Sequence, residues 1–384
     1  MTRSTATKES YERLTSIEPV LSRIARLHDF LPDIAYNMLF HAGPPYESST
    51  VIPRPVLNSI SAAASYEGLD ITEGEIHSGL AEGKIVLRPA QDIGLVTPLA
   101  FIASPRTWCI EVADRTYQNR RFLSPLNDGP PPNALRFGTG KAEGKDLLAK
   151  LDNAVASDLA QHLKKGTPLI PMFADAIAGG DDLHGHLAAL QDRLSDMFDI
   201  DNLSTNSIQY ITNANQFVLN IVMASAGLML KGGDNVEGSK MVTACGGNGL
   251  MLGYKLASHD DKWLQCLAKP PVGPKFPLFA SANPLAAIGD SAVIDVLGFG
   301  AANLRFCNTL CDALAEFVDN AFFTEKAHDP FIGPHPGFPL PGLRVGLDLG
   351  RPRTSLGIML GMVDAEGTRG LIGRGITPWE IING

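Results

Sequence analysis

The chain has 384 residues and a formal net charge of −9, with 45% apolar and 19% charged residues. This composition is that of a folded globular protein large enough for two or three domains. The acidic balance, without any run of basic residues, argues against nucleic acid or an anionic membrane surface as a partner. Five scattered cysteines have no disulfide or zinc spacing, and the longest apolar run (217–230) is too short to span a bilayer. We expect a cytoplasmic protein without a metal or cofactor.

The N-terminal third predicts alternating helices and strands. Apolar residues at helical spacing indicate a surface helix over 10–27, which Pro19 must kink or begin. A strand follows and ends at His41, before a turn stiffened by prolines. We then expect two helices, over 53–67 and 72–81, and three strands, over 84–90, 94–104 and 107–114.

Two titratable residues stand at the ends of these elements. His41 closes its strand just before Gly43 and two prolines, so its side chain either points from the sheet edge into a cleft or is a capped structural histidine. Glu67 closes the helix over 53–67. We expect it to orient a catalytic histidine if the site lies here.

The segment 124–145 is dense in proline and glycine and is the best candidate for a domain boundary. It contains Asn127 and Arg136. An arginine in a glycine-rich loop is either an anion-binding fork or an ordinary solvated side chain, and the local sequence leaves both open.

Helical spacing continues from 146 to 198, and the joint at 179–186 places Asp181 at a helix N-cap. His184 and His186 are about 200° apart on a helix, so this pair does not predict a metal site. The functional alternative is that His184 projects into a ligand cleft. A long apolar helix over 206–231 follows, and its buried amide Asn220 must find partners or line a site.

The stretch 239–300 contains two turns rich in glycine, each at the end of an apolar run. The first includes Asn248 and Gly249, and the second includes Asp290 and Ser291. Glycines allow close backbone approach to a ligand, so we interpret the two turns as walls of one site. A helix over 307–322, two strands over 342–363 and a glycine-rich tail complete the chain.

Motifs that are absent narrow the chemistry. There is no GxxxxGK[ST] loop, no GxGxxG spacing, no GxSxG elbow and no HExxH pair. The remaining polar candidates lack a nucleophile. Such a set suits binding an anion and polarising a carbonyl.

Eight short motifs in fixed order resemble the YlbE/AllG-like family of bacterial proteins, over residues 15–375. They are HAGPP (41–45), YEG (66–68), NDG…RFG (127–138), GDDLH (180–184), QFVLN (216–220), VTACGGNG (242–249), ANP…GDSA (282–292) and GLDL (346–349). That family includes a subunit of the oxamate carbamoyltransferase of anaerobic allantoin breakdown.

The resemblance implies an α+β fold with two mixed α/β domains (1–140 and 205–384) and a small helical domain between them (141–204). It also implies phosphorolysis of the oxalurate type, carried out with partner subunits. The chain departs from the family pattern at Gly247, at His186-Leu187, at Asn215 and in the apolar segment 356–363. A missing arginine at Gly247 would weaken anion binding, which leaves phosphate open as co-substrate.

We therefore predict a carbamoyltransferase-like or amide-cleaving enzyme acting on a small ureido or amide acid, in a homo-oligomer. One alternative is a non-catalytic subunit of a multi-subunit carbamoyltransferase, and another is a hydrolase or lyase of a biosynthetic pathway. His41 or His184 would be the acid or base, and backbone amides near Asn248 and Asp290 would stabilise an oxyanion. The predicted catalytic residues are His41, Glu67, His184 and Asp290, and the predicted substrate-binding residues are Gly43, Asn127, Arg136, Asp181, Asn220, Asn248, Gly249 and Ser291.

Overall fold

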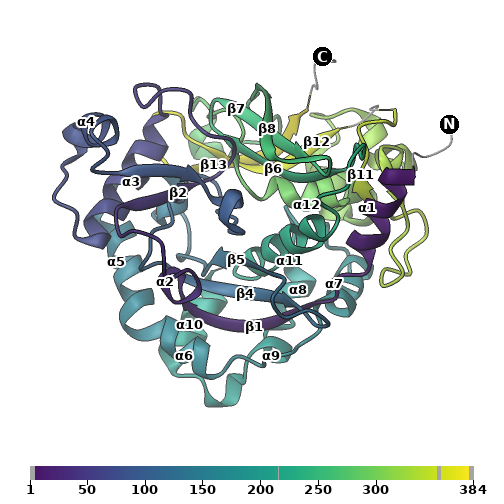
Figure 1. The fold of residues 1–384 in the computed structure, drawn as a ribbon, viewed down its shortest axis with the longest axis horizontal. Coiled ribbons are helices and arrows are strands. Elements are labelled where there is room, and N and C mark those ends of the chain that lie inside the picture. The colour runs from purple at the N-terminus through teal and green to yellow at the C-terminus, as the bar shows by residue number, and fades with distance from the viewer. Residues whose placement is uncertain (1–4, 215, 353–355, 380–384) are drawn as a thin grey trace.

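The computed structural model describes residues 5–214, 216–352 and 356–379. The α+β class is confirmed, because helices and several separate sheets build the fold. Figure 1 shows a three-stranded sheet in the lower half, a second group of strands in the upper half, and helix α11 between them.

The α-helices are α1 (Thr5–Thr15), α2 (Leu27–Phe30), α3 (Arg54–Glu67), α4 (Ile76–Ala81), α5 (Ala142–Lys150), α6 (Ala156–Gln161), α7 (Leu169–Ala178), α8 (Ala188–Gln191), α9 (Leu194–Met197), α10 (Thr205–Asn213), α11 (Leu219–Gly232), α12 (Ala292–Leu297) and α13 (Asn308–Leu314). The strands are β1 (Pro19–Arg26), β2 (Met38–His41), β3 (Val86–Pro89), β4 (Trp108–Asp114), β5 (Arg121–Pro125), β6 (Val242–Asn248), β7 (Met251–Leu256), β8 (His259–Leu267), β9 (Ile288–Gly289), β10 (Phe331–Gly333), β11 (Val345–Leu347), β12 (Gly357–Val363) and β13 (Leu371–Pro378).

The lower sheet has the order β1-β4-β5, with β1 antiparallel to β4. The predicted helix over 10–27 is wrong in its second half. Helix α1 ends at Thr15, and Pro19 starts strand β1. The apolar residues Ile17, Leu21 and Ile24 are buried as expected. A bulge between Leu21 and Arg23 breaks the strand period of two, which explains why their spacing imitated a helix.

The predicted strand over 94–104 does not form. Its residues make only isolated bridges, Leu95 with Leu123 and Phe40 with Ala103. Pro98 has no N–H group to donate, and Leu99 has φ +46, so the chain cannot remain extended. Strands β2 and β3 are confirmed and pair in parallel. The helix predicted over 72–81 is a 3₁₀ turn followed by α4, and Thr72 and Glu75 form a capping box at its start.

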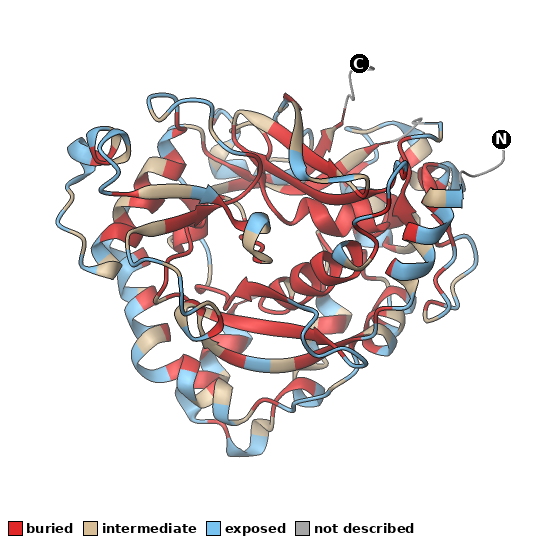
Figure 2. Cartoon of the chain, viewed as in Figure 1, coloured by how far each residue is buried: buried red, intermediate tan, exposed pale blue. Residues whose placement is uncertain are grey.

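The long helix predicted over 206–231 is two helices, α10 and α11, with a break between Asn213 and Leu219. Every residue of α11 from Asn220 to Leu230 is buried (Figure 2). The helix contacts β4 and β5 on one side and β6 and α12 on another. It therefore joins the lower sheet to the upper one.

The upper sheet has the order β8-β7-β6-β9. Gly246, Gly247 and Asn248 lie inside strand β6, so the first predicted glycine turn is displaced to Gly249, which has φ +85. Gly247 pairs with Gly289 of β9. The two glycine segments of the sequence are thus neighbouring strands.

Two further antiparallel pairs, β10 with β11 and β12 with β13, complete the fold. The two strands predicted over 342–363 are present, and part of the glycine-rich tail forms strand β13. The helix predicted over 307–322 is shorter, because α13 ends at Leu314. Among the described residues, no helix combines the length and apolar character needed to cross a membrane.

Candidate functional site

A cavity of about 370 Å³ brings together residues from most of the chain. This volume lies within the range of small-molecule sites. Five predicted site residues line it, namely Asn127, Arg136, His184, Asn220 and Ser291. The other lining residues are Pro98, Leu99, Pro131, Phe137, Gly185, His186, Leu187, Ala188, Gln216, Leu219, Phe276, Met359, Leu360, Gly361, Leu371, Gly373 and Arg374.

His184 is held in the cavity wall by two aspartates. The buried carboxylate of Asp182 accepts hydrogen bonds from the backbone amides of His184, Gly185 and His186, which shapes the loop. Nδ1 of His184 lies 2.7 Å from Oδ2 of Asp295. Asp295 is itself fixed, since its Oδ1 accepts from backbone amides of Ala301 and Met359.

The pairing with Asp295 determines the tautomer of His184. A carboxylate that accepts from Nδ1 places the hydrogen there and leaves Nε2 as an acceptor. Leu183, the preceding residue, has φ +68, which is rare for a bulky side chain. Leu99, which also lines the cavity, has φ +46. Such unfavourable backbone angles concentrate at functional sites.

Arg136 lies on a buried turn between two glycine-rich loops. Its backbone amide donates to Oδ2 of Asp128 at 3.0 Å, and its Nη1 forms an ion pair with Oδ1 of the same residue. Nη1 also donates to Oδ1 of Asn127 at 3.3 Å. Within the described residues these side-chain bonds all use Nη1, so the rest of the guanidinium fork is left for a ligand.

The two asparagines of the cavity are anchored through their amide groups. Asn220 donates through Nδ2 to the carbonyl oxygen of Pro125 at 2.8 Å and to the hydroxyl of Ser124 at 3.2 Å. Asn127 donates to the carbonyl oxygen of Gln216. Asn127 and Asn220 therefore do both things expected of buried amides: each binds neighbouring protein groups, and each lines the cavity.

Sequence reasoning missed three polar residues of the site. Asp295 is a lone acid in the apolar run of α12, and a buried acid requires a partner. Arg374 on β13 donates from Nη1 to the carbonyl oxygen of Gly185 at 3.0 Å and is exposed. His186, a departure from the family pattern, is not among the predicted site residues but lines the cavity. The sequence could have indicated Asp295, because an acid within an apolar helix needs a partner, whereas nothing in the sequence around Arg374 indicated a site residue.

The titratable side chains that line the cavity are all basic. Its lining residues include two arginines and two histidines, and no aspartate or glutamate is among the described residues that line it. The acids Asp128 and Asp295 stand behind Arg136 and His184. Leu99, Leu219, Phe276 and Leu360 supply apolar surface. The cavity therefore fits a small anion that carries a less polar part.

The second predicted glycine turn is a structural junction behind this cavity. The carboxylate of Asp290 accepts from the backbone amides of Gly43 and Thr97, both at 2.9 Å, and from Nε2 of Gln91 at 2.6 Å. Burial raises the pKa of the Asp290 carboxyl to about 7. Asp290 does not line the cavity. Its neighbour Ser291 does.

Four other predicted residues belong to the same junction. His41 is buried, with Nδ1 2.7 Å from the carbonyl oxygen of Ala42, and burial lowers its pKa to about 4. Nδ2 of Asn248 donates to the carbonyl oxygen of Pro44. A Cβ on Gly43 would lie 2.4 Å from the backbone carbon of Gly247. Gly249 makes the turn after β6. His41, Gly43, Asn248 and Gly249 thus pack against other parts of the protein, and none of them lines the cavity.

The predicted oxyanion site near Asn248 and Asp290 is corrected for the same reason. The amide of Gly249 donates to the carbonyl oxygen of Ala287, and the amide of Asp290 donates to that of Thr97, both at 2.9 Å. Because these donors already have protein acceptors, they cannot stabilise a developing oxyanion. Ser291, with its hydroxyl, is the residue of this segment that lines the cavity.

Glu67 and Asp181 also have other roles than predicted. Oε1 of Glu67 accepts from the backbone amide of Arg106 at 2.7 Å, so Asp295, and not Glu67, orients His184. The carboxylate of Asp181 accepts from the amides of Ala189 and Leu190 and caps helix α8. The N-cap position predicted for Asp181 is therefore wrong, because Leu187 is the N-cap residue of α8 and Asp181 accepts these hydrogen bonds from outside the helix.

Some of the departures from the family pattern line the cavity, and others do not. His186, Leu187 and the segment 359–361 line the cavity, and Asn215 lies outside the described residues. Gly247 does not line it. A Cβ at Gly247 would lie 2.2 Å from the carbonyl oxygen of Ala287, so this backbone admits no side chain there. The absence of an arginine at Gly247 therefore says nothing about this cavity.

The fold is α+β, and the cavity within it is lined, in the described part of the chain, by basic but not by acidic side chains. The described residues contain no group of three acidic, histidine or cysteine side chains placed to hold a metal ion. A family model for the oxamate carbamoyltransferase subunit AllG matches residues 85–291. The chain belongs to this family. The matched segment contains all five predicted residues that line the cavity.

Individual relatives agree with this assignment. The oxamate carbamoyltransferase subunit AllG of Escherichia coli (strain K12) is 25% identical over 300 residues, covering 74% of this chain and 69% of that protein. The uncharacterized protein YahG of the same strain is 21% identical over 391 residues, covering 97% and 82%. A crystal structure of a conserved protein of unknown function from Enterococcus faecalis V583 has a TM-score of 0.84 at 21% identity, covering 97% of this chain and 93% of that one.

Proposed function

We propose that the chain is a carbamoyltransferase-like or amide-cleaving enzyme acting on a small ureido or amide acid in the 370 Å³ cavity. The observation that carries this proposal is the lining itself. Two arginines and the Asp295-backed His184 meet in one cavity whose described lining has no acidic side chain. Membership of the AllG family supports the same class of reaction.

In this proposal the carboxylate of the substrate binds between Arg136 and Arg374. Guanidinium groups bind carboxylates through two parallel hydrogen bonds, which fixes orientation as well as affinity. Arg136 is buried and held by Asp128, so its guanidinium would bind the carboxylate from a fixed position. Arg374 is exposed at the rim of the cavity, so its side chain can move to bind the same carboxylate. The apolar wall of Leu219, Phe276 and Leu360 then contacts the rest of the substrate.

His184 is the proposed general acid and base. An oxygen of the acceptor attacks the carbamoyl or amide carbon, and its proton passes to Nε2 of His184. The C–N bond then breaks, and the departing nitrogen takes that proton from Nε2. Asp295 holds the ring and stabilises its transient positive charge, as a carboxylate behind a catalytic histidine does in other enzymes. The acceptor is phosphate in a transferase and water in a hydrolase.

The test is turnover by the purified chain. Oxamate with carbamoyl phosphate, and a panel of N-carbamoyl amino acids with and without phosphate, cover the proposed substrates. We expect His184→Asn to lower kcat by roughly 10²- to 10⁴-fold, the usual contribution of a general acid or base. His259→Asn is the control, because His259 is exposed on strand β8. Equal turnover of both variants on every substrate would show that the cavity is not the site of reaction.

The second candidate function is a non-catalytic subunit of a carbamoyltransferase. One relative is described as a subunit, and four exposed apolar residues, Leu267, Val272, Phe276 and Leu278, lie within one short segment. Phe276 also lines the cavity. An exposed apolar cluster beside a ligand site is typical of a surface that binds another protein. This candidate predicts a chain that binds the ligand but turns it over only when partner subunits are added.

A further inference from the structure

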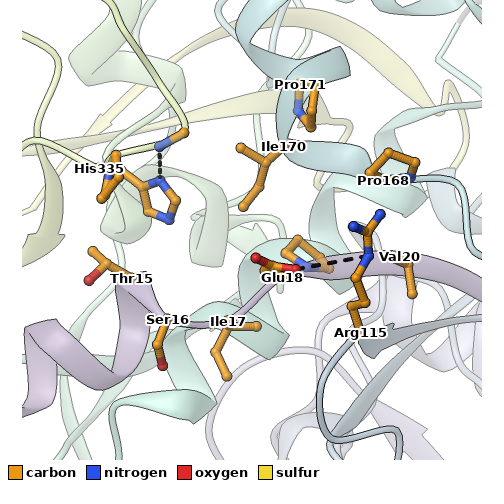
Figure 3. Close-up of a pocket in the computed structure, with 13 residues that line it drawn as sticks. Thr15, Ser16, Ile17, Glu18, Val20, Arg115, Pro168, Ile170, Pro171 and His335 are labelled. Carbon is orange, nitrogen blue, oxygen red and sulfur yellow. Dashed lines mark hydrogen bonds and ion pairs between the residues drawn. The ribbon is translucent and has the colours of Figure 1, made fainter.

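A second cavity of about 300 Å³ shares no lining residue with the first (Figure 3). It lies between the end of α1, the start of β1, the start of α7 and the loop after β10. Its polar side chains are Glu18, Arg115 and His335, with the hydroxyls of Thr15 and Ser16. Its apolar lining is Ile17, Pro19, Val20, Pro168, Ile170, Pro171 and Pro336. Neither the family motifs nor the proposed reaction uses any of these residues.

His335 has an unsatisfied hydrogen-bond donor at this cavity. The side chain is 4% exposed, and Nδ1 accepts a hydrogen bond from the amide of Gly337 at 3.0 Å. Burial lowers the pKa of the imidazole to about 4, so the ring is neutral near pH 7. A neutral ring that accepts at Nδ1 carries its hydrogen at Nε2. Nε2 is buried without a partner among the described residues.

The free nitrogen of His335 faces the cavity. Nδ1 is occupied by the amide of Gly337. Figure 3 shows the other ring nitrogen of His335 on the side of the space between Thr15 and Ile170. The hydroxyls of Thr15 and Ser16 donate to backbone carbonyls of their own helix, Tyr11 and Arg13 respectively. A buried donor without an acceptor is costly, and a bound oxygen atom would remove that cost.

A cationic group stands at the other end of the cavity. Figure 3 shows Arg115 on the far side from His335, beside Glu18. Nε of Arg115 is 3.9 Å from Oε2 of Glu18, which is too long for a hydrogen bond, and both side chains are more than half exposed. Such a pair is weak, so a carboxylate can compete for the guanidinium. Helix α7, whose first turn has no side-chain cap, begins at the same wall.

From these contacts we propose that the second cavity binds a small organic carboxylate with an uncharged oxygen acceptor at its other end. The carboxylate binds Arg115, and the acceptor oxygen, a ketone or amide carbonyl, receives the hydrogen bond from Nε2 of His335. A short apolar chain joins the two and lies against Ile170 and the prolines. The rigid proline-rich wall requires little ordering when the ligand binds.

The test compares three probes on the unmodified protein, by calorimetry or ligand-observed NMR. The probe 5-oxohexanoate has both groups, hexanoate lacks the ketone, and 2-hexanone lacks the carboxylate. We expect 5-oxohexanoate to bind about tenfold more tightly than either partial probe, because each loses one hydrogen-bonded group. Equal affinity of all three would overturn the proposal, and so would binding of inorganic phosphate in preference to 5-oxohexanoate.

Variants then locate the site. Arg115→Leu and His335→Phe should each weaken 5-oxohexanoate binding about tenfold, with the fold checked by circular dichroism. Arg120→Leu is the matched control, since Arg120 lies on the same loop but outside the cavity. Arg374→Gln reports on the first cavity, which the proposed function also assigns to a small carboxylate. Loss of binding in Arg374→Gln, and not in Arg115→Leu, would assign the probe to the first cavity and reject the second as its site.

Discussion

Nδ1 of His184 and Oδ2 of Asp295 lie 2.7 Å apart, although the two residues are 111 positions apart in the chain. The carboxylate is held by two backbone amides, so it presents one oxygen to the ring in a fixed direction. This pair gives the cavity a histidine of defined tautomer.

Replacing Asp295 by asparagine should reverse that tautomer. The asparagine oxygen would keep the bonds from Ala301 and Met359, and its amide group would donate to Nδ1 of His184. The hydrogen would then move to Nε2, which could no longer act as a base. We expect kcat to fall at least about 100-fold with little change in substrate affinity. Asp312→Asn, an exposed change, is the control, and an unchanged pH profile of kcat in Asp295→Asn would contradict the assignment.

Arg374→Gln should weaken binding without affecting stability. The side chain is exposed, so its loss leaves no buried charge unpaired, but it removes a charged hydrogen bond worth about 1.5 to 3 kcal/mol. We expect the Kd for the substrate carboxylate to rise about tenfold or more, measured by calorimetry, with an unchanged midpoint of urea unfolding. Arg88→Gln, on the exposed side of β3, should change neither quantity.

Arg136→Met, unlike Arg374→Gln, should also lower the free energy of unfolding. Arg136 and Asp128 are both buried, and breaking a buried ion pair from one side costs about 3 to 5 kcal/mol. Urea unfolding should show this loss directly. The double variant Asp128→Asn/Arg136→Met should recover much of it, because no lone charge remains. If both variants were equally unstable, the loss would come from packing rather than charge.

The stability gained from His41 should depend on pH. Burial lowers the pKa of its imidazole in the folded state to about 4, whereas in the unfolded chain the pKa is near its ordinary value of 6.5. Between these values the unfolded state binds the additional proton, so acidification favours unfolding. The difference in unfolding free energy between wild type and His41→Phe should shrink by up to roughly 3 kcal/mol from pH 7 to pH 4.

Gly43→Ala and Gly68→Ala separate backbone strain from steric overlap. Both glycines have φ +75. A Cβ at Gly68 meets nothing within 4 Å, whereas one at Gly43 would lie 2.4 Å from the backbone of Gly247. We expect Gly68→Ala to cost about 1 to 2 kcal/mol and Gly43→Ala about 1 to 3 kcal/mol more, in thermal or urea unfolding. Equal losses would mean that the junction around Asp290 can relax.

Local chemistry made part of the fold predictable. Helix α3 was recognisable from a proline in its first turn and Gly68 after its end, and α4 from its capping box. Strand β1 was not, because its bulge shifts the spacing of apolar residues toward that of a helix. The glycines of β6 were interpreted as a turn because a sequence does not show that Gly43 and strand β9 press against them.

The site was predictable to a similar extent. His184 and Arg136 stand in short polar motifs, so their residue types were informative by themselves. Arg374 reaches the cavity only because β13 pairs with β12, and the role of Asp295 depends on contact with a loop far earlier in the chain. His41 and Asp290 were instead predicted as site residues, although neither lines the cavity. Polar residues among glycines can hold a backbone junction together as readily as they bind a ligand.

Helix α11 imposes an order on the synthesis of this protein. The strands of the lower sheet are complete by Pro125, but the helix that contacts β4 and β5 is reached only at Leu219. Until then the emerging chain carries a sheet face whose apolar side chains have no cover. Nascent chains with such uncovered surface are prone to aggregate. The N-terminal part must therefore remain protected, by the ribosome or a chaperone, until the middle of the chain has left the exit tunnel.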